Sequence, residues 1–238
     1  MRIVVLTGAG ISAESGLGTF RDAGGVWTRV QLEDVATPEA YAADPAMVQS
    51  FYDARRAQAL AAEPNAAHRT LAELEQRLAA EGGQLIVVTQ NVDDLHERAG
   101  SKRVLHMHGE LFRVRCTGCG NVMEWRVDLS GDAGGPGRGA PCPSCGAPLR
   151  PHIVWFGEVP FHMDEIAEEV LEADFFAAIG TSGAVYPAAG YVDLARSAGV
   201  RTLEMNLEPS ENAYAFDERR YGPATEVVPE WAGTVSAS

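Results

Sequence analysis

Continuous apolar runs that alternate with amphipathic segments are the feature of this sequence that most constrains its fold. The clearest runs span residues 2–7, 84–90, 174–182 and 200–206, with a shorter one at 103–108. Strands that are apolar along their whole length are typical of a parallel sheet covered on both faces. Helical patterns lie between them at 64–80, where Asn65 is the predicted N-cap, at 163–172 and at 186–199. The alternation predicts an α/β fold with a doubly wound parallel sheet, which binds ligands at the carboxyl ends of its strands.

Two segments interrupt this alternation. Residues 109–150 carry the cysteines, a short strand pattern and a tract rich in Gly and Pro, and a second excursion at 29–63 is helical. A segment so poor in apolar residues cannot build much core of its own. We therefore expect residues 29–63 and 109–150 to be modules attached to an α/β domain made of 1–28, 64–108 and 151–238.

All four cysteines fall into two CxxC pairs, which are Cys116 with Cys119 and Cys142 with Cys145. Two such pairs at this separation are typical of a zinc site in which two short turns supply tetrahedral thiolate ligands. Two disulfides or unrelated core cysteines remain the alternatives. Because zinc would use all four thiolates, we expect one structural Zn²⁺ with no open coordination position.

The charge balance excludes several classes of protein. Lys and Arg number 19 against 33 Asp and Glu, which gives a net charge of −14. This balance argues against direct nucleic-acid binding, which requires a basic face, and favours basic partners such as lysine-rich peptides. The apolar run at 3–6 is too short for a signal peptide, and no run approaches the roughly 18 apolar residues of a membrane span. We expect a cytoplasmic protein that binds no membrane.

The turn after the first predicted strand reads "TGAGISAESGLGTFRD" and is rich in glycine. Gly8 and Gly10 would let the backbone approach a ligand closely, and Arg21 adds a cationic partner for phosphate. The spacing differs from the GxGxxG fingerprint of dinucleotide-binding proteins. Nucleotide binding and a plain glycine-rich turn therefore both remain open for this segment alone.

Polar side chains recur where other predicted strands end. The set comprises Thr89, Gln90, Asn91, Asp93, Gly180, Thr181, Ser182 and Asn206. A doubly wound sheet presents its ligand-binding groups at these positions, although loop and helix-cap chemistry explains some of them. In "HMHGE", His106 and His108 alternate, so one is expected to face the sheet packing and the other the ligand edge. We expect His108 to exchange a proton there near neutral pH.

The ordered set of motifs resembles one family closely. The motifs are "GAGISAESGLGTFR", "TQNVDDLHERAG", "HMHGEL", the two CxxC pairs, "VWFGE", "GTSGAVYPAA" and "NLEPS". Together they resemble the sirtuins, NAD-dependent protein-lysine deacylases, and most closely the bacterial class III members. The resemblance runs in order from about residue 3 to 230 and implies a Rossmann-like NAD-binding domain with a small domain made of the helical module and a zinc-ribbon module.

The resemblance also implies which residues bind NAD, the co-substrate. They are Gly8, Ala9, Gly10, Ser12, Glu14, Phe20, Arg21, Trp27, Gln90, Asn91, Val92, Asp93, Gly180, Thr181, Ser182, Asn206, Leu207, Glu208 and Ala224. The acyl-lysine peptide or protein is expected to lie beside Val154, Phe156 and Gly157 and beside "GAVYP", as an added strand.

The resemblance also implies roles in the reaction for three residues. His108 is expected to act as the general base on the ribose hydroxyls, Asp93 to engage the nicotinamide carboxamide, and Asn91 to position water or ribose. The products would be nicotinamide, a free lysine and O-acyl-ADP-ribose.

A Tyr-x-x-Arg pair sets the expected acyl preference. On the predicted helix that contains "SFYDARRAQAL", Val48, Phe51 and Ala59 form an apolar stripe, with Arg55 near its middle and Arg56 toward the rim. In class III sirtuins the matching pair lines the acyl pocket, which here implies Tyr52 and Arg55. Arg55 would then grip the distal carboxylate of a succinyl or malonyl group. A buried Arg paired with a local Asp or Glu is the alternative.

Other classes of protein share part of this pattern. A mono-ADP-ribosyltransferase would use the same NAD chemistry, and a non-catalytic NAD- and zinc-binding module would keep the binding loops. A nicotinamide oxidoreductase lacks support because the dinucleotide fingerprint is absent. A zinc-ribbon nucleic-acid module explains the cysteines but not the charge.

Overall fold

The computed structural model describes residues 1–18, 32–130 and 139–236, and all structural statements refer to these residues. Its main layer is a six-stranded sheet in the order β3-β2-β1-β7-β8-β9, and every pairing in it is parallel. The strands are β1 (Arg2–Thr7), β2 (Gln84–Thr89), β3 (Val104–His106), β7 (Phe175–Ile179), β8 (Arg201–Asn206) and β9 (Glu218–Tyr221). The first strand, β1, lies in the middle of the sheet. Strands β2 and β3 extend the sheet on one side of β1, and β7, β8 and β9 extend it on the other. This is the predicted doubly wound order, and its switch point lies between β1 and β7.

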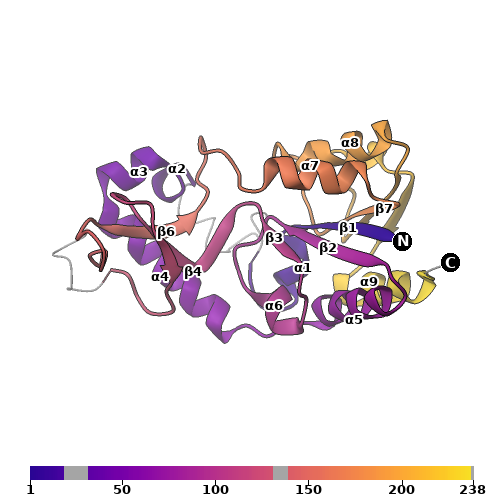
Figure 1. Cartoon of the computed structure of the whole chain (residues 1–238), viewed down its shortest axis with the longest axis horizontal. Helices are drawn as coiled ribbons and strands as arrows, with labels where there is room; N and C mark the ends of the chain where they lie inside the picture. The colour runs from indigo at the N-terminus through magenta and orange to yellow at the C-terminus, as the bar shows by residue number, and fades with distance from the viewer. Residues whose placement is uncertain (19–31, 131–138, 237–238) are drawn as a thin grey trace.

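Alternating residues of one strand pack against helices on opposite faces of the sheet. Ile3 and Val5 of β1 belong to the core under α5 (Ala66–Ala80) and α9 (Ala224–Thr234). Val4 and Leu6 belong to the core under α7 (Met163–Leu171) and α8 (Tyr191–Ser197). Figure 1 shows these two helical layers below and above the sheet. Burial on both faces explains why the strands carry no polar alternation.

A second, smaller body lies beside the sheet and occupies the left of Figure 1. It contains the antiparallel sheet β5-β4-β6, formed by β4 (Gly109–Cys116), β5 (Val122–Glu124) and β6 (Leu149–Ile153). It also contains α2 (Leu32–Val35), α3 (Pro38–Ala43) and α4 (Pro45–Ala61). Val48 and Tyr52 of α4 share one core with Leu111 and Phe112 of β4 and with Trp155. The helical and cysteine-containing segments therefore pack together, although they are far apart in the sequence.

The sequence patterns locate most elements but miss several. Asn65 is the N-cap of α5 as predicted, because its Oδ1 accepts hydrogen bonds from the amides of Ala67 and His68. Strand β9, helix α9 and the strands β4 and β6 were not predicted, since their residues lack a continuous apolar pattern. The remaining short elements are α1 (Ala9–Ala13), α6 (Leu95–Ala99), η3 (Ala188–Gly190) and η4 (Ala213–Ala215).

The predicted helical phase of α4 is wrong at its two arginines. Val48 and Ala59 are buried as expected, but Arg56 is 1% exposed whereas Arg55 is only half-buried. Arg56 therefore lies at the middle of the buried face and Arg55 at its border.

Partners from distant segments explain this difference. The Arg56 guanidinium pairs with Asp53 and donates to the Leu111 carbonyl at 2.9 Å. Asp53 in turn accepts from the amides of Leu129 and Ser130, each at 2.8 Å. A buried ion pair that also bonds to backbone groups can occupy a helix face that a count of apolar residues alone would not identify. The alternative of an Arg paired with a local acid thus holds for Arg56.

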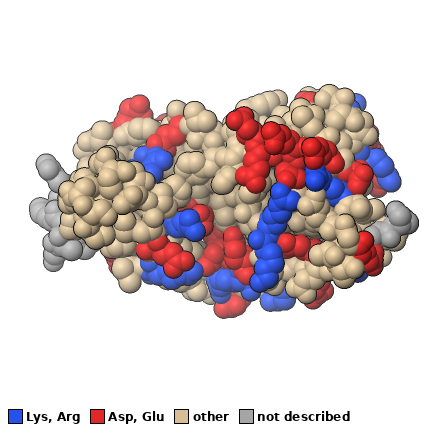
Figure 2. Space-filling view, in the orientation of Figure 1, with Lys and Arg blue, Asp and Glu red and all other residues tan. Residues whose placement is uncertain are grey.

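The surface shown in Figure 2 carries interspersed acidic and basic side chains, with acidic ones gathered over α7. A short stripe of basic side chains runs downward from this acidic group, and other basic side chains on the described part of this face lie among acidic ones. Among the described residues, no helix is both long and apolar enough to cross a membrane.

Candidate active site at the switch point

The loops that follow β1 and β7 are in direct contact at the switch point. The amide of Gly8 donates to the Ile179 carbonyl at 3.0 Å, and the amide of Gly10 donates to Gly180 at 2.9 Å. A Cβ on Gly8 would lie 2.7 Å from the Gly180 carbonyl oxygen, and one on Gly10 would lie 2.6 Å from the Gly180 Cα. Gly8 and Gly10 are therefore required for the packing of one loop on the other. This packing brings two of the predicted NAD-binding segments together.

Asn91 and Asp93, which follow β2, join the same place through Ser12. The Asn91 amide group donates to the Gly8 carbonyl at 3.1 Å and to Ser12 Oγ at 3.2 Å. Ser12 Oγ donates to Asp93 Oδ2 at 3.4 Å, and all three side chains are buried. Both amide hydrogens of Asn91 are thus used, which leaves its Oδ1 for another partner. Burial raises the pKa of Asp93, although the hydrogen bond from the Leu95 amide opposes this shift.

His108 lies next to this group with a defined tautomer. Its Nδ1 lies 3.2 Å from the carbonyl oxygen of Gln90. A carbonyl oxygen only accepts hydrogen bonds, so Nδ1 carries the hydrogen and Nε2 keeps a lone pair. Burial lowers the pKa of His108, and the bond to Gln90 only partly opposes this. The ring is therefore neutral near pH 7 and presents Nε2 as a base.

Helix α4 brings Tyr52 and Arg55 to the same region. The buried Tyr52 hydroxyl accepts a hydrogen bond from Trp155 Nε1 at 3.0 Å. Burial lowers the pKa of Arg55, whereas the negative charge of Asp93 and the Tyr52 hydroxyl raise it. Arg55 is therefore within electrostatic reach of Asp93, on the small-domain side of the site.

The side chains of two other predicted NAD-binding residues form hydrogen bonds with neighbouring segments of the protein. Asn206 donates to the Thr181 carbonyl at 2.8 Å and so ties the end of β8 to the loop after β7. The Glu14 carboxylate accepts from the amide and hydroxyl of Thr225, at 3.0 and 2.6 Å. Glu14 thus fastens α1 to the start of α9, beside Ala224.

The other predicted residues fall into three groups. Ala9, Val92, Thr181, Ser182 and Val154 are partly buried, and Ser182 Oγ accepts from the Ala184 amide. Leu207, Glu208, Phe156 and Gly157 are exposed. Phe20, Arg21 and Trp27 lie outside the described residues.

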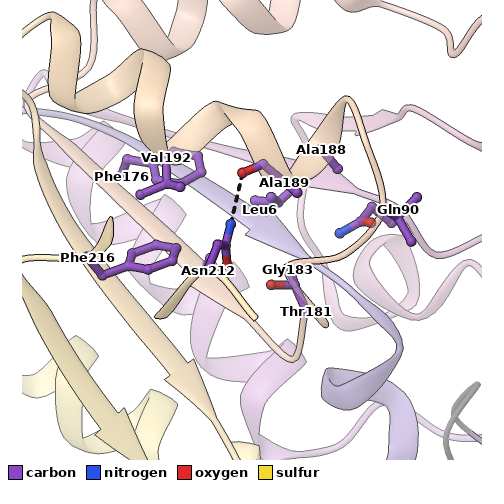
Figure 3. A pocket seen from close by; sticks show the side chains of 12 residues that line it. Leu6, Gln90, Phe176, Thr181, Gly183, Ala188, Ala189, Val192, Asn212 and Phe216 are labelled. Carbon is purple, nitrogen blue, oxygen red and sulfur yellow. Dashed lines mark hydrogen bonds between the residues drawn. The ribbon is translucent and has the colours of Figure 1, made fainter. Parts of the chain in front are cut away.

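Two hollows differ in what they can hold. The one in Figure 3 lies between the loop after β7 and α8, includes Gln90 and Thr181 in its lining, and has a volume of about 10 Å³. That volume admits at most one water molecule. A groove of about 520 Å³ has Asp93, Glu97 and His106 among its lining residues. Its volume is in the range of small-molecule sites.

The four cysteines form one cluster in the small body. Their Sγ atoms all lie within 4.8 Å of one another, and none forms a disulfide. Cys116 ends β4 and Cys119 lies in the turn that follows it, whereas Cys142 and Cys145 lie at the turn before β6. The Cys116–Cys145 and Cys119–Cys142 separations are 3.4 and 3.8 Å, against about 3.8 Å for tetrahedral Zn–S bonds of 2.3 Å. The amides of Cys119 and Gly118 donate to Cys116 Sγ and lower the pKa of that thiol to about 6. The donor set suits a structural Zn²⁺.

The comparisons with known proteins agree with this geometry. The model of the Sir2 family matches residues 8–187. The chain belongs to the Sir2 family. An NAD-dependent protein deacylase of Caulobacter vibrioides is 57% identical over 233 residues, which cover 97% of this Sir2 chain and 95% of that protein.

Solved structures resemble this Sir2 protein over nearly its whole length. A Sir2 homologue in complex with NAD superposes with a TM-score of 0.86 at 40% identity, covering 98% of this chain and 88% of the other. A Sir2 structure with a deacetylated p53 peptide and 3'-O-acetyl ADP ribose has a TM-score of 0.80 at 28% identity, covering 97% and 90%. The predicted sirtuin resemblance and fold class are confirmed.

The contact between Trp155 and Tyr52 of this Sir2 protein was not predicted from the sequence. The tryptophan lies inside the quoted "VWFGE" motif, between two residues that were predicted to touch the peptide. Its indole N–H holds the Tyr52 hydroxyl, and its ring lies under the Arg150 guanidinium at 3.3 Å. The only sequence signal was its place in the motif.

Zinc removal is expected to disorganise the small body of this Sir2 protein. In Cys142→Ser, three thiolates remain, so bound zinc should fall from one ion per chain to well below one. Because β4 leads into one cysteine turn and β6 follows the other, we expect the thermal unfolding midpoint to fall as well. Metal analysis of the purified protein and a thermal melt measure these effects. Full zinc content in Cys142→Ser would contradict the assignment.

Two buried histidines, His68 of α5 and His96 of α6, are expected to lower the stability of this Sir2 protein in acid. Burial lowers the pKa of His68 to about 4 and that of His96 well below its usual value. An unfolded histidine titrates near 6.5, so the unfolded chain binds the extra protons as the pH falls below that value. The contribution of neutral His68 to the free energy of unfolding is therefore fully present above about pH 6.5. It is lost progressively toward pH 4, by roughly 3 kcal/mol.

The variant His68→Gln isolates this effect. Urea unfolding of the wild type and the variant at pH 7 and pH 4.5 gives the difference between their free energies of unfolding. That difference should shift in favour of the variant at the lower pH. A difference that is the same at both pH values would contradict the prediction.

Proposed function

We propose that this Sir2 protein is an NAD-dependent protein-lysine deacylase that removes acetyl, succinyl and malonyl groups and releases nicotinamide and O-acyl-ADP-ribose. The observation that carries the proposal is the neutral His108, whose Nδ1 is held by the carbonyl of Gln90, the residue before the buried Asn91. The Caulobacter relative, which matches over nearly its whole length, is an NAD-dependent protein deacylase, and this supports the proposal.

We assign NAD to the loops that meet at the switch point, with the residues given in the sequence analysis. Gly8 and Gly180 form the floor of this site, and Asn91 Oδ1 and the Asp93 carboxylate are the acceptors next to it. A carboxylate suits the amide hydrogens of nicotinamide, and Asn91 Oδ1 suits a water or ribose hydroxyl. When bound, NAD supplies the carbon that nicotinamide leaves and the hydroxyl that receives the acyl group.

His108 would act as the general base of this reaction. The Gln90 carbonyl holds the hydrogen on Nδ1 and so aims the lone pair of Nε2 away from the strand. The lowered pKa keeps the ring unprotonated at neutral pH, ready to take a proton from a ribose hydroxyl. Ser12 and Asn91 hold the neighbouring loop in place while the proton moves.

Tyr52 and Arg55 would line the acyl pocket and prefer acyl groups that end in a carboxylate. Trp155 holds the Tyr52 hydroxyl as an acceptor, so the Tyr52 O–H can donate to the acyl carboxylate. Arg55 can add a bidentate contact, which is the strong form of carboxylate recognition. The peptide backbone would run along Val154, Phe156 and Gly157.

We also propose the division of the chain into a Rossmann-like domain, 1–28, 64–108 and 151–238, and a small domain of 29–63 with 109–150, whose sheet extends to Ile153 at the end of β6. The core shared by α4 and β4 supports a single small domain. Thiols that hold zinc and form no disulfide suit a reducing compartment, and we propose a cytoplasmic location.

The experiment that tests the function follows an acetyl-lysine and a succinyl-lysine peptide by mass spectrometry with and without NAD. We expect conversion to free lysine only with NAD. A parallel reaction with NAD labelled in its ADP-ribose tests the ADP-ribosyltransferase alternative. Label bound to protein, with the acyl-lysine unchanged, would overturn the proposal in favour of that alternative.

A further inference from the structure

The proposed chemistry does not use His106, yet this histidine is buried and has an acceptor at each ring nitrogen. Its Nε2 lies 2.7 Å from Glu97 Oε1, and its Nδ1 lies 3.2 Å from the carbonyl oxygen of Asn91. Neither a carboxylate nor a carbonyl oxygen donates a hydrogen bond. An imidazole makes both bonds at once only when both nitrogens carry hydrogen, which is the protonated form.

The bond to Asn91 connects His106 with the site described above. Gln90 and Asn91 are consecutive, and their carbonyls accept from His108 and His106 respectively. The two histidines of "HMHGE" therefore hold two adjacent peptide groups of one loop. That loop carries the Asn91 side chain and, two residues later, Asp93, so a rotation of its backbone would displace both.

The groove of about 520 Å³ opens beside His106 and connects it with solvent. Glu97, on α6, is 41% exposed at its side chain, so protons can exchange with the pair from this side. The charged groups around His106 come from four elements and the loops between them. They are Asp93 and Asp94 before α6, His96, Glu97 and Arg98 on α6, Glu110 and Arg113 on β4, Glu124 and Arg126 at β5, and His162 before α7.

Most of these charges have partners other than His106. Arg126 and Arg98 pair with Asp94, Arg113 pairs with Glu110, and His162 pairs with Glu165. Glu97 is the carboxylate that His106 contacts. Burial alone lowers the pKa of His106, but the hydrogen bond and charge of Glu97, the charge of Glu110 and the Asn91 carbonyl together raise it above its usual value.

We propose that His106 and Glu97 are positioning residues for the proposed deacylation: the doubly donating His106 ring, anchored by Glu97, fixes the Asn91 carbonyl and thereby the loop that carries Gln90, Asn91 and Asp93. The inference rests on the proposed function. Loss of a proton from His106 removes one of its two donors, so the loop is held less firmly. His108 must be neutral and His106 charged, which limits activity to the pH interval between their titrations.

The variant Glu97→Gln tests the pair because the amide oxygen still accepts from His106 Nε2 but carries no charge. We expect the alkaline limb of the kcat profile to move to lower pH by about one unit, since a neighbouring carboxylate typically shifts a pKa by one to three units. The acid limb, which belongs to His108, should stay in place. Side-chain nitrogen NMR of the histidines should show His106 shifting by the same amount.

Glu63→Gln is the matched control. It removes an equal charge from a carboxylate that pairs with Arg98, which lies next to Glu97 on α6. Neither limb should move in this variant. A His106 resonance that shifts in Glu97→Gln while the alkaline limb does not would overturn the inference, and so would a wild-type His106 that titrates below 6.5.

Failure of the proposed function is a separate result. A wild type without NAD-dependent turnover at any pH contradicts that function. In that case, the affinities of the wild type and of Glu97→Gln for NAD are measured by calorimetry over the same range of pH. If the affinity weakens at a lower pH in the variant than in the wild type, the positioning role of His106 and Glu97 is supported. If the two pH dependences are identical, that role is overturned.

Discussion

His108→Ala is expected to lower the rate of NAD-dependent deacylation by about 10²–10⁴-fold, which is the usual contribution of a general base. The expectation follows from the tautomer: the Gln90 carbonyl occupies Nδ1, so the proton must be taken by Nε2, and alanine offers no replacement. The measurement is kcat with an acyl-lysine peptide at saturating NAD.

The fold and the metal should survive this substitution. His108 is only partly buried, and the cysteine cluster lies at the far ends of β4 and β6. Unchanged zinc content and a thermal midpoint close to that of the wild type would separate a chemical defect from misfolding. His108→Ala with a rate within a fewfold of the wild type would remove His108 from the role of base.

Arg55→Met is expected to change the acyl preference more than the activity itself. An acetyl group has no carboxylate, so kcat/KM for an acetyl-lysine peptide should fall only a fewfold. For a succinyl-lysine peptide the loss of two charge-assisted hydrogen bonds, about 1.5–3 kcal/mol each, predicts a loss of about 10²–10⁴-fold. Matched peptides with acetyl, succinyl and malonyl groups measure the three values.

The neighbouring arginine provides a control for this experiment. Arg56→Met leaves Asp53 buried without its cation, which should cost about 3–5 kcal/mol of stability and affect all acyl groups alike. Arg55→Lys keeps the charge but lacks the planar guanidinium group that makes two parallel hydrogen bonds. Its kcat/KM for the succinyl-lysine peptide should therefore lie between that of Arg55→Met and that of the wild type. Equal losses on acetyl and succinyl peptides in Arg55→Met would show that Arg55 is structural.

Features that depend on short stretches of chain could be predicted from the sequence. The apolar runs specify a parallel sheet because burial on both faces demands them, and the two CxxC turns specify a cluster because each turn places its own pair of thiols. Both predictions are confirmed. The residues around His108 were also expected at one edge of the sheet, where the carboxyl ends of the strands meet.

Features that depend on a distant partner could not be predicted. Arg56 is buried because Asp53 accepts from Leu129 and Ser130, which are far along the chain, and this reversed the expected phase of α4. The ring of His106 is held by Glu97 from another element. Hydrophobic periodicity records only which residues are apolar. It carries no record of a polar contact made after the chain has folded.

The most direct test of the proposed deacylase activity is the stoichiometry of its products. The purified protein is incubated with a succinyl-lysine peptide and NAD, and nicotinamide, free-lysine peptide and O-succinyl-ADP-ribose are measured over time. The account predicts equal amounts of all three at every time point and none without NAD. Free lysine formed without nicotinamide, or nicotinamide formed while the peptide remains acylated, would contradict it.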